Sequence, residues 1–263
     1  MSEPAVILDV SGGAATITLN RPDRLNAWDR AFGEELLAAV ERAASDEAIR
    51  ALMITGAGRA FSSGADLREE REPGADGVPD LSARLRELYH PILLGIREMP
   101  KPVLAAVNGP AVGIGCSLAL ACDLIIAAES SYMLLAFVNI GLVPDGGSTA
   151  FVPARAGAAR ALEMALLGAR LPAAKALEWG LVNRVVADDE HAGVSAELLE
   201  KLAKGPTRSY ANAKRLLNRR LYPDLAEQLE AEAEAQREQG NTADFVEGVL
   251  AFVQKRPPEF TGS

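Results

Sequence analysis

The stretch "PVLAAVNGPAVGIGCSLALACDLIIAAE", residues 102–129, contains three structural elements separated by turn residues. Residues 102–107 and 124–128 are apolar runs of strand length, and an apolar helix is predicted near 114–122 between them. The turn "NGPAVGIG" joins the first strand to the helix, and its glycines let the backbone approach a ligand closely. Alternation of strands and helices of this kind is typical of an α/β protein.

The same alternation extends outward from this stretch. The N-terminal pattern predicts a hairpin across Gly12-Gly13 and a helix that Asp29 caps. The elements expected before residue 102 are strands 6–10, 15–19 and 51–55, a Gly-rich loop 56–64, and helices 30–44 and 81–98. After Asp145 the pattern is mostly helical and is interrupted at 181–186. The charged run "LAEQLEAEAEAQREQ" (225–239) is interpreted as a solvated helix face.

Composition and charge limit the classes of partner. The chain has 263 residues, of which 49% are hydrophobic, and a net charge of −9, which argues against a nucleic-acid backbone as the main partner. Neither a secretory segment after Met1 nor an apolar run of about 18 residues is present, so we expect a cytoplasmic protein without membrane contact. Cys116 and Cys122 are expected to be buried thiols, with no disulfide and no metal site.

Two Gly-rich turns are candidates for a binding site. "AFSSGADL" (60–67) follows one predicted strand and "NGPAVGIG" (108–115) follows the next. Two converging backbone amides would form an oxyanion hole, which requires no particular side chain. The alternative is that both are ordinary strand-to-helix turns. A dinucleotide site and a serine hydrolase are disfavoured, because the third glycine of the former and the G-x-S-x-G motif of the latter are missing.

The histidines add no catalytic cluster. His90 is expected within a helix, and His191 is expected on a polar surface segment. The segment "NIGLVPDGGSTAF" (139–151) instead places a single acid, Asp145, between a proline and two glycines. A helix starting near Ser148 would lower the pKa of this carboxyl, and burial would raise it; we expect burial to dominate once a substrate is bound. The alternative interpretation of Asp145 is a simple helix N-cap.

Together, "PVLAAVNGPAVGIGCSLALACDLIIAAE", "RAFSSGADL" (59–67) and "GLVPDGGST" (141–149) resemble the crotonase (enoyl-CoA hydratase/isomerase) superfamily. The resemblance extends from "ITLNRPDRLNA" (17–27) to "FVQKRPPEFTG" (252–262). It implies an α/β fold: a spiral of ββα turns over 1–195 that holds the acyl-CoA site, and a C-terminal helical segment over 196–263. It also implies acyl-CoA thioester substrates, no cofactor beyond the coenzyme A of the substrate, and a homotrimer or hexamer. An apolar stripe of Phe245, Val249 and Phe252 fits such a helical segment.

The resemblance assigns roles to particular positions. The oxyanion-hole amides correspond to Ala65 and Ile114. Two further groups of residues correspond to coenzyme A contacts: Ala65, Asp66, Leu67 and Arg68 at the thioester segment, and Arg24, Leu25 and Lys255 near the nucleotide portion. Asp66 is also expected to cap the segment that follows it.

Departures from the family pattern select the reaction. The two glutamates that hold water in a hydratase correspond to Ser117 and Phe137, so both acids are missing. "GPAVGI" and "PDGGS" resemble the Δ3,Δ2-enoyl-CoA isomerases and the isomerases of the phenylacetate pathway, which have one acid at the position of Asp145. One carboxylate could move a proton from C2 to C4 of an enoyl chain. Alternatives are a 1,2-epoxyphenylacetyl-CoA isomerase, a hydratase, and a non-catalytic homologue that binds CoA or RNA.

Overall fold

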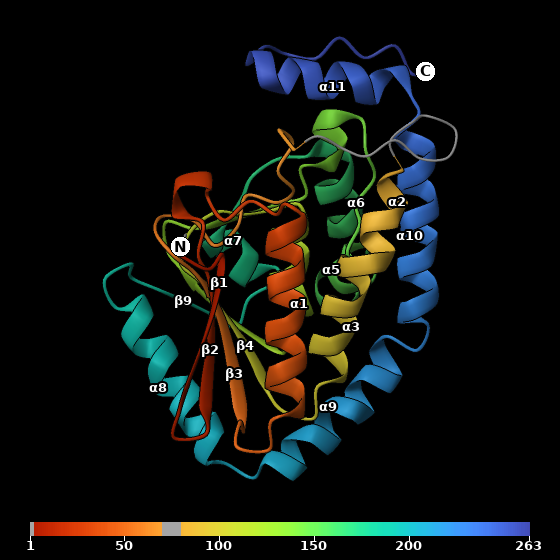
Figure 1. Ribbon diagram of the computed structural model, residues 1–263. Helices are drawn as coiled ribbons and strands as arrows, with labels where there is room; N and C mark the ends of the chain where they lie inside the picture. Colours follow the sequence, from red (N-terminus) through yellow and green to blue (C-terminus); the bar gives the residue numbers. More distant parts are fainter. Residues whose placement is uncertain (1–2, 70–79) are drawn as a thin grey trace.

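The computed structural model describes residues 3–69 and 80–263 and contains two sheets among them (Figure 1). The larger sheet has the strand order β1-β2-β3-β4-β6-β9 and the smaller the order β5-β7-β8. The strands of the large sheet are β1 (Val6–Ser11), β2 (Ala14–Leu19), β3 (Ala51–Gly56), β4 (Val103–Val107), β6 (Leu124–Ala128) and β9 (Arg184–Val186). Those of the small sheet are β5 (Ala111–Val112), β7 (Tyr132–Leu134) and β8 (Leu171–Pro172).

The large sheet is parallel except for its N-terminal hairpin. β1 and β2 pair antiparallel, and every other neighbouring pair in this sheet is parallel. The carboxyl ends of β3 and β4 therefore meet at one edge, where the loops that follow them lie side by side. This edge is the usual ligand position in open α/β sheets.

Helices cover both faces of the sheet, as the alternation of side chains along the strands requires. Leu52 and Ile54 of β3 belong to the main core with α1 (Arg30–Ser45) and α3 (His90–Glu98). Ala51 and Met53 of the same strand pack in a second cluster with residues of α8 (His191–Lys204). β4 is buried along its whole length, which suits an inner strand of a parallel sheet.

The first helices follow their sequence signals. Asp29 caps α1, because its Oδ1 accepts a hydrogen bond of 2.9 Å from the amide of Phe32. The helix expected over 81–98 is present as α2 (Leu81–Arg84), a π-turn at Leu85–Tyr89 and α3 in direct succession. α4 (Ile114–Ala121) is fully buried, in agreement with its apolar sequence.

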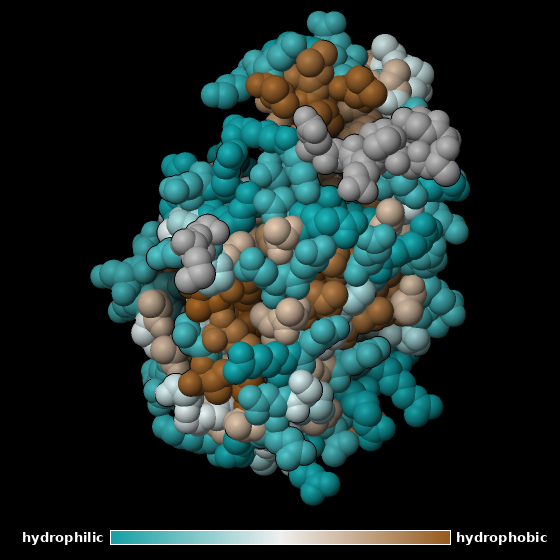
Figure 2. Space-filling view, in the orientation of Figure 1, coloured by the Kyte–Doolittle hydropathy of each residue, from teal (hydrophilic) through white to brown (hydrophobic). Residues whose placement is uncertain are grey.

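The second half of the chain is largely helical, and its last helices lie on the outside of the molecule. α5 (Ser148–Ala156), α6 (Ala158–Leu167) and α7 (Ala173–Glu178) precede α8, and α9 (Thr207–Leu221), α10 (Leu225–Gln239) and α11 (Ala243–Gln254) follow it. Figure 1 shows α8 to α11 passing around the outside of the molecule, with α11 at its top. α11 packs on a 3₁₀ turn at Phe137–Ile140, where a Cβ on Gly248 would lie 2.6 Å from Cα of Ile140. Its outer face is apolar (Figure 2).

The α/β architecture and the predicted order of strands and helices are confirmed, and two expectations are wrong. His191 is buried at the start of α8, with its Nε2 3.2 Å from the carbonyl oxygen of Ile126, and does not lie on a polar surface. The charged run 225–239 is not only a solvated face: α10 buries Glu232 and Gln236. The division of the chain at residue 195 stays a prediction, and that position lies inside α8. None of the helices in the described ranges is long and apolar enough to cross a bilayer.

Candidate active site

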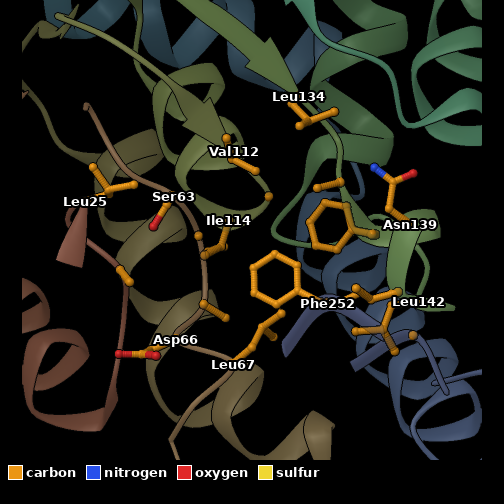
Figure 3. Close-up of a pocket in the computed structure, with 18 of the residues that line it drawn as sticks. Leu25, Ser63, Asp66, Leu67, Val112, Ile114, Leu134, Asn139, Leu142 and Phe252 are labelled. Carbon is orange, nitrogen blue, oxygen red and sulfur yellow. The ribbon is translucent and has the colours of Figure 1, made fainter. Parts of the chain in front are cut away.

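A cavity of about 590 Å³ lies where the loops after β3 and β4 meet α11 and the Asp145 turn (Figure 3). Its lining comes from five parts of the chain that are distant in sequence. These are the N-terminal segment with Asp23, Arg24, Leu25 and Ala27; the loop residues Arg59 and Ser63 to Arg68; Tyr89 of the π-turn; residues of the segment from Val112 to Asp145; and Gln236 with C-terminal residues between Gly248 and Pro258. The fold therefore builds this site from the whole chain.

The two Gly-rich loops are held against each other by backbone contacts. Residues Ser62 and Ala111 form an isolated parallel bridge, and the amide of Val112 donates to the carbonyl of Ser62 at 2.9 Å. Gly64 has φ +90° and Gly113 has φ +53°, conformations that L residues rarely adopt. A Cβ on Gly64 would lie only 2.9 Å from the carbonyl oxygen of Val112, so glycine is required for this close approach.

This arrangement brings the predicted amides of Ala65 and Ile114 into one site. Each follows one of the two glycines, and a Cβ on Gly64 would lie 3.7 Å from Cα of Gly113. Both Ala65 and Ile114 line the cavity. Ile114 is the first residue of α4, where a backbone N–H has no partner within the helix. Within residues 3–69 and 80–263, neither amide donates a hydrogen bond, so both remain available to a ligand oxygen.

The Asp145 turn packs directly on the start of α4. Gly146 and Gly147 have φ of +64° and +76°, and a Cβ on Gly146 would lie 2.5 Å from Cδ1 of Ile114. The hydroxyl of Ser117 donates to the carbonyl oxygen of Asp145 at 2.8 Å. The position expected to carry a glutamate in a hydratase therefore carries a residue that holds this turn.

The carboxyl group of Asp145 is buried, with 5% of the residue exposed, and lines the cavity. Its Oδ2 accepts a hydrogen bond of 2.7 Å from Nε2 of Gln236, and its Oδ1 is buried without a partner in the described part of the chain. Burial raises the pKa of Asp145 to about 8; the nearby charge of Glu232 raises it further, and the hydrogen bond from Gln236 opposes the shift. Burial thus outweighs the helix dipole even without a substrate.

The side chain of Asp145 does not cap a helix. α5 begins at Ser148, as expected, but its N-cap is Gly147 and no side chain caps it. The N-cap interpretation of Asp145 is therefore wrong. Asp66, by contrast, does form the expected local contact, since its Oδ1 accepts from the amide of Arg68 at 3.2 Å.

Glu232 of α10 was not identified from the sequence, and it completes the surroundings of Asp145. It is 3% exposed, and its carboxylate accepts from the amides of Gly147 at 2.7 Å and Thr149 at 3.2 Å, and from the hydroxyl of Thr149. Burial raises the pKa of Glu232 to about 7. Its spacing of four residues from Gln236 was a signal that both lie on one helix face.

The predicted coenzyme A contacts gather at the cavity with one exception. Arg24, Leu25 and the segment 65–68 line it. Lys255 does not: it is exposed and ends α11 with φ +56°. The next residue, Arg256, lines the cavity instead, although its guanidinium is paired with Glu247 at 2.7 Å.

The other end of the cavity is apolar and aromatic. Figure 3 shows Phe252 of α11 extending toward Leu67 and Leu142, with Ile114 beside them. Phe137 also lines this end and is 8% exposed. An apolar chain attached to a thioester would find hydrophobic contacts here and a buried carboxyl group beside it.

Comparisons with known proteins agree with this geometry. The family model for enoyl-CoA hydratase/isomerase matches residues 9–263. The chain is 40% identical to 1,2-epoxyphenylacetyl-CoA isomerase of Escherichia coli (strain K12), covering 98% of each chain, and 44% identical to a protein named probable enoyl-CoA hydratase of Rhodobacter capsulatus, covering 100% of each. A solved enoyl-CoA hydratase from Mycobacterium avium subsp. paratuberculosis K-10 superposes with a TM-score of 0.90 at 39% identity, covering 98% of each chain.

The match extends over nearly the entire chain and includes both sequence and structure. The chain has the crotonase fold and belongs to the enoyl-CoA hydratase/isomerase family, a family of enzymes that act on acyl-CoA thioesters.

Proposed function

We propose that the protein is an isomerase that converts 3-enoyl-CoA to trans-2-enoyl-CoA, with Asp145 as the sole proton carrier. One observation carries the proposal: Asp145 is a buried carboxyl group on the wall of the cavity that Ala65 and Ile114 also line, and the amides of these two residues have no acceptor in the described structure. A hydroxyl and a phenyl ring, from Ser117 and Phe137, occupy the positions where a hydratase would hold water between two acids. Among the described residues, the acids that line the cavity are Asp23, Asp66 and Asp145, and Asp145 is the one whose turn contacts Ser117.

The reaction needs one carboxylate and a stabilised enolate. The amides of Ala65 and Ile114 hydrogen-bond to the thioester oxygen, which takes up charge as the C2–H bond breaks and its proton passes to Asp145. The electron pair then shifts to form the C2–C3 double bond as the C3–C4 double bond opens, and Asp145 returns the proton to C4. A base with a pKa near 8 is well matched to this exchange near neutral pH.

Coenzyme A enters only as part of the substrate in this proposal. Its polar portion would lie along Arg24, Leu25 and the segment 65–68, while the acyl chain would extend toward Phe137 and Phe252. Arg59, which also lines the cavity, adds positive charge for the phosphates.

The test compares two rates on purified protein. Formation of the conjugated thioester from 3-enoyl-CoA should be much faster than hydration of trans-2-enoyl-CoA, and both can be followed by ultraviolet absorbance. Asp145→Asn should lower the isomerisation kcat by at least about 10²-fold with little change in KM, because the amide cannot accept a proton. Hydration at an equal or greater rate would contradict the proposal and favour a hydratase.

A second candidate is isomerisation of 1,2-epoxyphenylacetyl-CoA. It is favoured by the 40% identity to the Escherichia coli isomerase of that name and by the aromatic side chains at the apolar end of the cavity. Including aryl-CoA thioesters in the same screen separates the two reactions. If none of the thioesters is turned over, a non-catalytic homologue is favoured, and a binding assay with CoA and with a labelled RNA would distinguish its ligands.

A further inference from the structure

Two polar residues of α10 contact the Asp145 turn from a helix that begins 80 residues later in the chain. Gln236 donates to Oδ2 of Asp145 at 2.7 Å and to the carbonyl oxygen of Val143 at 3.0 Å. Glu232, one turn earlier, accepts the amide of Gly147 at 2.7 Å. All three polar side chains, Asp145, Glu232 and Gln236, are at least 95% buried.

The contacts of Gln236 fix which way its amide faces. A carbonyl oxygen such as that of Val143 only accepts hydrogen bonds, so the group facing it must be the NH2 group and not Oε1. The same NH2 group then uses its second hydrogen on Oδ2 of Asp145. When Asp145 is protonated, a proton on Oδ2 would face this donor, so the proton belongs on Oδ1, which has no partner in the described structure.

We propose that α10 is part of the active site, with Gln236 as a positioning residue that reserves Oδ1 of Asp145 as the single oxygen that takes the proton from C2 and returns it to C4. Glu232 supports this arrangement by holding the backbone of the turn through Gly147 and Thr149. This inference rests on the proposed role of Asp145 as the proton carrier.

The two α10 residues act on Asp145 with opposite signs. The charge of Glu232 disfavours a second negative charge nearby and raises the pKa of Asp145, whereas the hydrogen bond from Gln236 favours the carboxylate and lowers it. The other charged residues that line the same cavity in the described structure are Asp23, Arg24, Arg59, Asp66, Arg68 and Arg256, and burial, Glu232 and Gln236 are the causes assigned to the pKa shift of Asp145. Removal of either α10 group should therefore move the titration in a known direction.

The experiment measures kcat, KM and the pH profile of kcat/KM for two variants with 3-enoyl-CoA. Gln236→Met should lower kcat about 10- to 100-fold, since the base loses its orientation. It should also move the rising limb of the kcat/KM profile, which reports deprotonation of Asp145, to higher pH, because the hydrogen bond that lowers the pKa of Asp145 is lost. Glu232→Gln should move the same limb to lower pH. KM should change little in both, because neither residue is assigned to coenzyme A. Glu234→Gln, at an exposed position on the same helix, is the matched control and should match the wild type.

Shifts in the same direction, or unchanged profiles in both folded variants, would overturn the inference. Gln236→Asn keeps the amide but is one methylene shorter, and it replaces Gln236→Met with the same expectation if the latter does not fold. If Glu232→Gln does not fold, the sign of the Gln236 shift decides alone. Asp145→Asn distinguishes failure of the proposed function from failure of this inference. If Asp145→Asn stays fully active, the proposed function is contradicted. If Asp145→Asn is inactive but the α10 variants have unshifted pH profiles, only the role of α10 is contradicted.

Discussion

Asp145 and Glu232 are two buried carboxyl groups that share one turn, and their pKa values are raised to about 8 and about 7. Both shifts arise mainly from burial, which penalises the charged form. The folded protein therefore retains protons near neutral pH that the unfolded chain has already released. Above pH 7 these two buried carboxyl groups therefore lower the folding stability of the protein.

This linkage predicts how stability depends on pH. An acid whose pKa is raised by folding contributes stability below its ordinary pKa, and that contribution is lost as pH rises toward the folded value. For Asp145 the window runs from 3.8 to about 8. Asp145→Asn removes this pH dependence, because an amide does not titrate. At pH 8 we therefore expect the free energy of unfolding of the variant to exceed that of the wild type by at least ~1 kcal/mol, since each unit of pKa shift corresponds to about 1.4 kcal/mol.

Urea unfolding at pH 5 and pH 8 measures this effect. The difference between variant and wild type should be larger at pH 8 than at pH 5. Equal differences at both values would mean that the carboxyl group of Asp145 titrates normally in the folded protein.

The sequence predicted some of these residues and not others, for a physical reason. Asp145 was identified because its signal is local: a proline and two glycines surround a single acid. Glu232 and Gln236 lie 87 and 91 residues from it along the chain. They occur in a run with many similar charged residues, and only tertiary packing determines which of them α10 buries.

At the scale of elements, the loops after β3 and β4 form the amide pair because their glycines permit a close backbone approach. These loops were predicted, since each is a Gly-rich turn after an apolar strand. The small sheet of β5, β7 and β8 was not, because its strands are only two or three residues long and give no periodic pattern. Lys255 was expected near the nucleotide portion of coenzyme A, but α11 ends there with that residue exposed, and Arg256 lines the cavity.

Gly64→Ala tests the requirement for close approach. The new Cβ would lie 2.9 Å from the carbonyl oxygen of Val112 and would displace the amide of Ala65. We expect a loss in kcat of at least about 10-fold, since one well-placed oxyanion donor contributes about 10²–10³-fold. The measurement is steady-state turnover of 3-enoyl-CoA.

Gly157→Ala provides the matched control. Its φ of +84° is close to the +90° of Gly64, but no atom of the described residues lies within 4 Å of its added Cβ. Both variants should lose roughly 1–3 kcal/mol of stability from backbone strain. Only Gly64→Ala should lose turnover, and similar kinetics for the two variants would argue against the amide of Ala65 as a ligand.

At the scale of the whole molecule, several helices expose large apolar residues. They lie on α6 (Leu162, Leu166, Leu167), α9 (Leu216, Leu217, Leu221) and α11 (Val246, Leu250, Phe252, Val253). Figure 2 shows the α11 group at the top of the molecule. Of the stripe predicted in α11, Phe245 is buried within the chain, whereas Phe252 lines the cavity and is 59% exposed.

Such surfaces favour association in solution, and the trimer or hexamer stays a prediction. Light scattering across a dilution series should give about three or six times the 27.8 kDa mass of one chain. The mass should persist at micromolar concentration, because burying several leucines per chain stabilises the contact. A monomer at that concentration would contradict this expectation.

The packing of α11 on the 3₁₀ turn Phe137–Ile140 places the helix that borders the apolar end of the cavity apart from the contacts of Asp145. Phe252 and Ala251 of α11 border the apolar end of the cavity, whereas the hydrogen bonds to Asp145 come from α10. Under the proposed function, substitutions on α11 change the surroundings of the acyl chain and leave the hydrogen bond from Gln236 to Asp145 in place. The helix that borders the apolar end of the cavity and the helix that hydrogen-bonds to Asp145 can therefore be altered independently of each other.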